Sequence, residues 1–321
     1  MQTNDGYIED EGISATAKSK AMAAASPITF ECLESANSPH KSEEFRMTPE
    51  EALVFLIDSF RKFHPRMGAA AQAILDQERY DLEDSPFGCG TYPVVPDMSE
   101  SNLFFSPYPP KAGDVKPEHR HLSFVDLPTV PDADGKIGVE KILSLFHEMA
   151  HGIAFDLAHE AGNAVEPVAA SIGETFSLLG ERIGAYAMLQ RAAPEQKYSI
   201  ASGYCSNING MLTATAKNGE GSFGQKDATY IFGLLASEEL FVQWVEGDPR
   251  ERAAIAGSVV SVMEKGNTVN FGKQFGAQLG MDNADFPKNG LEHKRYFDKE
   301  ALAVLSSKQQ HTTVHDAGYF R

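Results

Sequence analysis

Apolar residues recur at helical spacing along much of this chain, and the first such stretch follows a clear start signal. Residues 48–51 read Thr-Pro-Glu-Glu, which offers a hydroxyl cap, a proline at the first helical position and acids in the first turn. Apolar positions then continue to Phe60. The pattern predicts one helix from Thr48 to about Phe60 and a second from Pro65 to about Gln77.

The pattern of apolar residues changes between Phe87 and Pro128, where glycine and proline separate short runs of residues that favour β-strands. These runs lie at residues 91–95, 102–105 and 122–125. They predict a small β-sheet that precedes the next helix.

Helical spacing returns at residues 137–158, 167–190, 228–245 and 248–264. Residues 202–226 are rich in glycine and asparagine, which predicts a mobile loop. Residues 1–45 carry few large apolar side chains and are expected to form a disordered or weakly ordered tail. The fold class expected is mainly α with a small β-sheet, as a single domain over residues 46–321.

Composition narrows the classes of partner. The net charge is −17, which opposes binding to nucleic acid or to an anionic membrane. No apolar run approaches a membrane span, and the first residues lack the features of a Sec signal peptide. The three cysteines are odd in number and far apart. We expect a cytoplasmic protein, with export through the N-terminal tail left open.

The candidate chemistry lies in the stretch at residues 137–158, which contains the sequence H-E-x-x-H. His147 and His151 are four residues apart, so a helix places them on one face, close enough to hold a single zinc ion. Glu148 follows the first histidine and is expected to act as general base on the zinc-bound water. The motif predicts a zinc hydrolase, most simply a peptidase.

A catalytic zinc site usually has three protein ligands, so a third is expected downstream. Glu160 is too near to His151 in the sequence to fold back onto the same helix. Glu166 stands beside a proline at a helix start, where an acid stabilises the helix dipole. Glu174 and Glu181 are seven residues apart and share one face of the next helix. We assign Glu174 as the third ligand and Glu181 as the acceptor of a hydrogen bond from a ligand histidine; an ion pair of Glu181 with a neighbouring arginine is the alternative.

These segments together resemble the thimet oligopeptidase and oligoendopeptidase F family of zinc peptidases. That family has an H-E-x-G-H helix followed by a helix with the pattern E-x-x-S-x-x-x-E, which residues 174–181 match. Residues 87–96 with 102–105 resemble its glycine-rich strand pair, and residues 229–237 resemble its Y-x-F-G-Y-L-x-S helix. The resemblance covers about residues 46–260. It implies a mainly helical zinc-peptidase catalytic domain that cleaves short peptides, with His147, His151 and Glu174 as ligands and Glu148 as base.

The negative oxygen of the tetrahedral intermediate needs a donor besides zinc. Leu234 stands where the family has a tyrosine in that role, so we expect Tyr230, one helical turn earlier, to donate. Tyr204 and His159 are weaker alternatives.

An extended peptide substrate is expected to bind by main-chain hydrogen bonds near Asn102 and Phe104. Two other functions remain open. One is a catalytically impaired, zinc-stabilised protein that binds peptides or proteins, and the other is a zinc hydrolase of non-peptide substrates.

Overall fold

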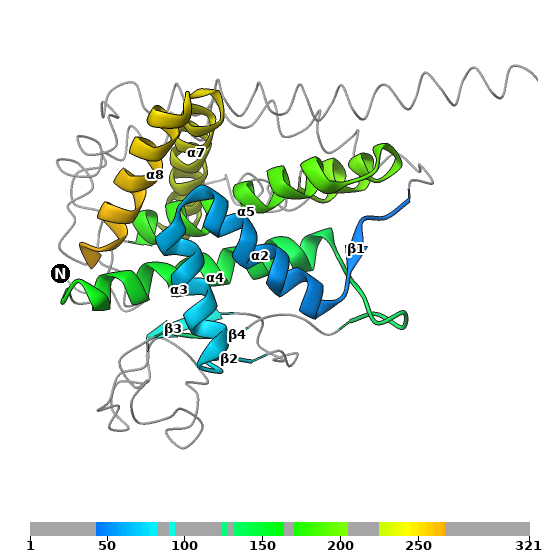
Figure 1. The fold of residues 1–321 in the computed structure, drawn as a ribbon, viewed down its shortest axis with the longest axis horizontal. Coiled ribbons are helices and arrows are strands. Elements are labelled where there is room, and N and C mark those ends of the chain that lie inside the picture. The colour runs from blue at the N-terminus through cyan, green and yellow to red at the C-terminus, as the bar shows by residue number, and fades with distance from the viewer. Residues whose placement is uncertain are drawn as a thin grey trace, which may run out of the picture.

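The structure is a computed structural model that describes residues 43–81, 90–93, 123–126, 131–163, 170–204 and 225–266. The elements in chain order are β1 (Arg46–Met47), α2 (Pro49–Phe63), α3 (Pro65–Asp76), β2 (Tyr80–Asp81), β3 (Gly90–Pro93), β4 (Ser123–Asp126), β5 (Ile137–Gly138), α4 (Val139–Glu160), α5 (Ala170–Arg191), the 3-10 helix η2 (Pro194–Gln196), α7 (Gln225–Glu246) and α8 (Pro249–Met263). This part of the chain is mainly helical with small sheets, which confirms the coarse fold class (Figure 1).

The first two helices begin where the sequence signals placed them. Thr48 and Glu51 form a capping box, in which the Glu51 N–H donates to Thr48 Oγ1 at 3.2 Å and the Thr48 N–H donates to Glu51 Oε2 at 3.0 Å. His64 ends α2 in an extended conformation, and its Nδ1 accepts from the Arg66 N–H at 3.2 Å. One residue therefore stops the first helix and caps the second.

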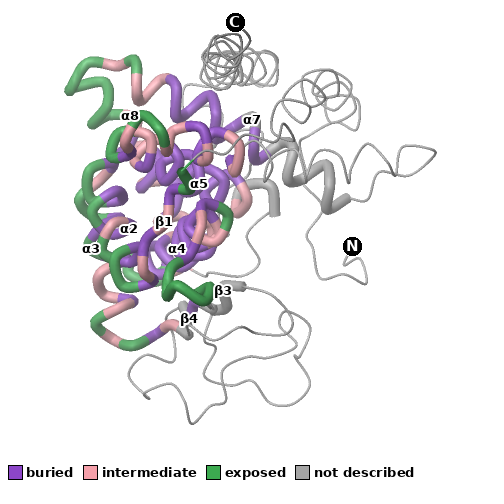
Figure 2. The backbone as a smooth tube through the Cα atoms, turned by 90° about the vertical axis from the view of Figure 1, so that its right-hand side faces the viewer, coloured by how far each residue is buried: buried purple, intermediate pink, exposed green. Residues whose placement is uncertain are grey.

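Helix α4 is the central element. The sequence predicted a start at Ile137, but the helix begins at Val139, because Ile137 and Gly138 pair antiparallel with β1. Buried residues occur around nearly its whole circumference, as is typical of a helix with neighbours on every side. Helix α5 and the strands β3 and β4 pack against it, with α7 in turn packed on α5 (Figures 1 and 2).

The three-stranded sheet has β4 at its centre, parallel to β2 and antiparallel to β3. Strands β3 and β4 match two of the runs predicted from the sequence, while residues 102–105, the third, lie outside the described residues. A buried ion pair ties the sheet to α4: Arg79, directly before β2, binds Asp156 through two nitrogens, one at 3.1 Å from Oδ1. This pair fixes the sheet along the second half of α4.

The core extends slightly further towards the N-terminus than the sequence predicted. Phe45 is buried, and its N–H donates to Ser199 Oγ at 2.8 Å, although residues up to 45 had been assigned to the tail. Residues 1–42 lie outside the described residues. Residues 197–204 are helical, so the first three residues of the predicted loop at 202–226 belong to a helix. Among the described residues, no helix has the length and apolarity needed to cross a membrane.

Two glycines bring α5 unusually close to α4. A Cβ at Gly180 would lie 2.6 Å from the backbone oxygen of Phe146 and 2.8 Å from Ala150 Cβ. A Cβ at Gly184 would lie 2.8 Å from the ring of Phe146. All three distances are too short for a Cβ atom, so the packing of the two helices requires glycine at both positions.

We therefore expect Gly180→Ala to lower the free energy of unfolding by roughly 1–3 kcal/mol, because the added methyl forces α5 away from the α4 backbone. The matched control is Gly257→Ala in α8, where a Cβ meets nothing within 4 Å. That change should raise stability by roughly 0.5–1 kcal/mol through helix propensity alone. Denaturant unfolding of both variants checks the difference, and equal effects would contradict the packing account.

Candidate metal centre

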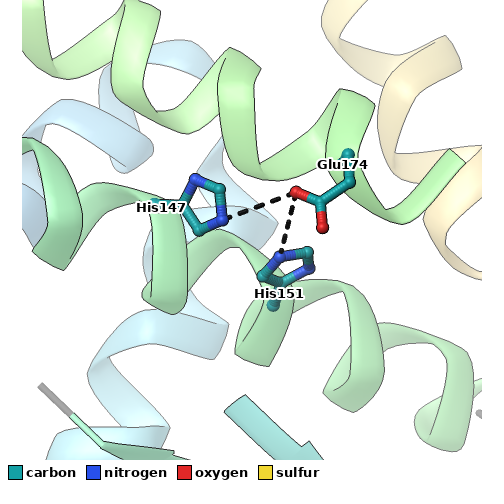
Figure 3. Close-up of side chains that lie close together, drawn as sticks. All are labelled: His147, His151 and Glu174. Carbon is teal, nitrogen blue, oxygen red and sulfur yellow. Dashed lines mark ion pairs between the residues drawn. The ribbon is translucent and has the colours of Figure 1, made fainter. Parts of the chain in front are cut away.

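Three of the sequence-predicted site residues come together between α4 and α5. His147 and His151 lie one turn apart on α4 with ring centroids 5.0 Å apart. Glu174 reaches them from α5, with its Oε2 atom 3.5 Å from His147 Nε2 and 3.8 Å from His151 Nε2 (Figure 3). All three ligand atoms lie within 4.8 Å of one another.

These distances suit one small cation. Ligands at about 2.0–2.1 Å around a tetrahedral zinc ion lie roughly 3.3 Å from one another. The two distances from Glu174 to the imidazoles are a few tenths of an ångström longer than that. Side-chain rotations that bring the three atoms, which lie within 4.8 Å of one another, to this spacing would place them around a single ion.

Glu174 is held in place from two directions. Ser177, one turn further along α5, donates its hydroxyl to Glu174 Oε2 at 2.9 Å. Gly233 of α7 lies against the other side, where a Cβ would be 2.9 Å from the Glu174 carbonyl carbon and 3.0 Å from its Cβ. Neither Ser177 nor Gly233 was predicted to have a role, although a glycine inside a predicted helix indicates close packing of a neighbouring element.

Glu181 contacts the outer nitrogen of the first histidine. Its Oε1 atom lies 2.6 Å from His147 Nδ1, so an N–H at Nδ1 donates to the carboxylate and Nε2 points towards Glu174. Glu181 is buried, with 4% of its side chain exposed. The nearby arginine in the sequence, Arg182, forms its own buried pair with Glu238, Nε to carboxylate at 3.2 Å.

The electrostatics of the site are dominated by acids. Burial lowers the pKa of His147, but the hydrogen bond to Glu181 and the charges of Glu181, Glu148 and Glu174 raise it to about 10. Burial lowers the pKa of His151, against the opposing charges of Glu174 and Glu148. Glu148 is itself buried at 7% exposure, and its charge acts on both imidazoles. Three carboxylates therefore surround two histidines, an excess of negative charge away from bulk water.

The remaining predicted residues are placed differently. Tyr204 is buried and donates its hydroxyl to Glu238 Oε1 at 2.8 Å, so it belongs to a core cluster with Arg182. His159 is exposed at the end of α4. Tyr230 lies in α7, one turn before Gly233, but its side chain is outside the described residues, as are Asn102, Phe104 and Glu166.

Comparison with models of known protein families, with curated proteins and with solved structures found no significant match. The resemblance to the oligopeptidase family therefore stays a prediction. The case for function depends on the residues and their geometry.

We expect purified protein to hold about one zinc ion per chain. His151→Ala and Glu174→Ala should each lose most of it, because each removes one of three ligands. Glu181→Gln should keep the site but weaken zinc affinity by roughly 10- to 100-fold, since it removes the charge that orients His147. Metal analysis after dialysis against a graded chelator measures all three effects.

Glu166→Ala is the control and should retain zinc. If it emptied the site while Glu174→Ala left it full, the ligand assignment would be wrong.

Proposed function

We propose that the protein is a zinc-dependent peptidase that hydrolyses short or extended peptides, with His147, His151 and Glu174 as the zinc ligands. The convergence of two imidazole nitrogens and one carboxylate oxygen at a partly exposed point is the observation that carries this proposal. The three side chains are 13–16% exposed, so the site is sheltered but reachable.

The donor set favours zinc. Two imidazoles and one carboxylate form a ligand set found at catalytic zinc sites, which keep a fourth position for water or substrate. The two buried carboxylates, Glu148 and Glu181, also support a divalent cation, because buried charges are costly unless an opposite charge balances them.

Zinc held there would supply a Lewis acid that polarises the scissile carbonyl and acidifies a water molecule. Glu148 would take the proton of the attacking water and deliver it to the leaving amine. Glu181 would hold the His147 ring in one orientation through Nδ1. The peptide would lie beside Asn102 and Phe104 and pair through its main chain.

The position of Glu148 favours turnover over a purely structural role. Structural zinc sites are normally closed by four protein ligands, whereas here three ligand atoms converge among the described residues. Glu148 is a further buried carboxylate whose charge is felt at both histidines. A third acid in that place, besides Glu174 and Glu181, suits a general base.

Glu148→Gln should retain zinc and fold but reduce peptide hydrolysis by at least about 100-fold, because the amide cannot accept the proton of water. Turnover of a quenched peptide library, with zinc content measured on the same samples, checks this. Glu140→Gln, an exposed change in the first turn of the same helix, is the matched control. Undiminished hydrolysis by Glu148→Gln would rule out the mechanism, and a zinc-loaded wild type without turnover would favour the zinc-stabilised binding protein.

Tyr230 is proposed as the oxyanion donor, since it lies one turn before Gly233, the residue of α7 that packs against Glu174. Tyr230→Phe should lower kcat by roughly 100-fold, with KM and zinc content nearly unchanged. Tyr186→Phe in α5 provides a control with the same atom removed. A silent Tyr230→Phe in steady-state kinetics would exclude Tyr230 as the donor.

A further inference from the structure

A buried ion pair joins α5 to α7, and the mechanism proposed above does not use it. Arg182 of α5 pairs with Glu238 of α7, and the two side chains are 5% and 0% exposed. Buried ion pairs often stabilise a fold no more than apolar side chains of similar size would. Stability alone is therefore a weak reason for these two charges to be buried here.

Several contacts fix the position of Arg182 relative to α7. Its Nε atom lies 3.2 Å from both carboxylate oxygens of Glu238. Tyr204, which is also buried, donates its hydroxyl to Glu238 Oε1 at 2.8 Å. The guanidinium lies 4.4 Å from the centroid of the Phe241 ring and 5.5 Å from that of Tyr204. The Arg182 side chain is thus held by two partners of α7 and by one residue of the preceding helical segment.

Arg182 directly follows Glu181, whose Oε1 atom lies 2.6 Å from His147 Nδ1. Successive side chains of an α-helix point about 100° apart, so these two face different neighbours. Glu181 contacts α4 and Arg182 contacts α7, and α5 packs against both helices. Any rotation of α5 about its own axis would move the two side chains together. The pair with Glu238 therefore sets the rotation at which Glu181 meets His147.

The glycine contacts of α5 do not supply this constraint. Gly180, Gly184 and Gly233 determine how closely α5 approaches α4 and α7. Apolar packing of this kind is not directional, whereas a hydrogen bond between ionised groups has a preferred geometry. Because the charges of Arg182 and Glu238 are opposite, the main effect of the pair on the metal centre is geometric.

We propose that Arg182 is a positioning residue of the metal centre, which holds Glu181 against His147 through its ion pair with Glu238. Arg182 acts through Glu181 and is not itself a ligand. This role depends on the proposed function, because it requires zinc on His147. Loss of the pair should weaken zinc binding although all three ligands remain.

The test compares zinc affinity in variants that keep the three ligands. The double variant Arg182→Met with Glu238→Leu replaces the pair by apolar side chains, so no buried charge is left unbalanced and the chain should fold. Its zinc affinity should fall by roughly tenfold, as is typical when the partner of a ligand histidine is disturbed. The visible spectrum of the cobalt(II)-loaded protein should change as well, because it reports the ligand geometry.

Two single variants keep the test decisive. Arg182→Lys preserves the charge and should retain most of the zinc affinity and the wild-type cobalt spectrum. Tyr204→Phe removes only the hydroxyl that binds Glu238, and it should weaken zinc binding less than the double variant does. If the double variant does not fold, the zinc affinity of Tyr204→Phe decides the question.

Arg191→Met, at the end of α5, is the matched control. It removes an exposed arginine that lies over the Phe55 ring at 5.6 Å, and it should change neither zinc affinity nor the cobalt spectrum. Wild-type zinc affinity in the double variant and in Tyr204→Phe, or an equal loss with Arg191→Met, would overturn the positioning role and leave the zinc site in place. A wild type that binds zinc but cleaves no peptide would contradict the peptidase and not this role, whereas a wild type without zinc would contradict both.

Discussion

The closeness of α5 to α4 determines what the candidate metal centre can do. Phe146, which α5 contacts through Gly180 and Gly184, directly precedes His147. Glu174 and Glu181 stand on either side of Gly180 in the same helix. One backbone contact therefore sets the distance from both carboxylates to the histidines, and any residue larger than glycine would move both acids away together. Because helices in a packed core shift as rigid bodies, the ligand and its partner are positioned as a pair.

Charge is the second constraint. Arg182 forms an ion pair with Glu238, and its guanidinium also lies 4.4 Å from the centroid of the Phe241 ring. The opposite charges of this cluster between α5 and α7 therefore balance each other. Glu174 and Glu181 of α5 point away from that cluster and contact His147. The charge of Glu148 acts on the same histidine. The charges of these acids raise the pKa of His147, against the lowering effect of its burial. The zinc ion proposed here would balance this negative charge.

The sequence predicted what local rules control. The cap of α2 follows from Thr48, and the starts of α2 and α3 follow from prolines at their first positions, although the His64 cap of α3 was not predicted. The placement of the i, i+4 histidines and of the i, i+7 glutamates on one helix face follows from helical spacing. The two-residue strands β1, β2 and β5 were not predicted, because each exists only through a distant partner. The same holds for the contact of Gly233 with Glu174. It also holds for a small apolar hollow beside His151, which is lined by residues of α4 and α8 about 110 positions apart in the sequence. Such features depend on tertiary packing, which local patterns do not encode.

The second half of α4 unites these features. Ala154, Phe155 and Ala158 face the hollow, while Asp156 is buried in its pair with Arg79 on the sheet side. The turn of α4 that follows His151 is therefore held on its sheet side by an ion pair between two side chains that are almost entirely buried. Removing one partner of such a pair leaves a buried charge without compensation, which typically costs about 3–5 kcal/mol. The sheet thus does more than precede α4 in the sequence, because through Arg79 it holds in place the turn of α4 that follows the second candidate ligand, His151.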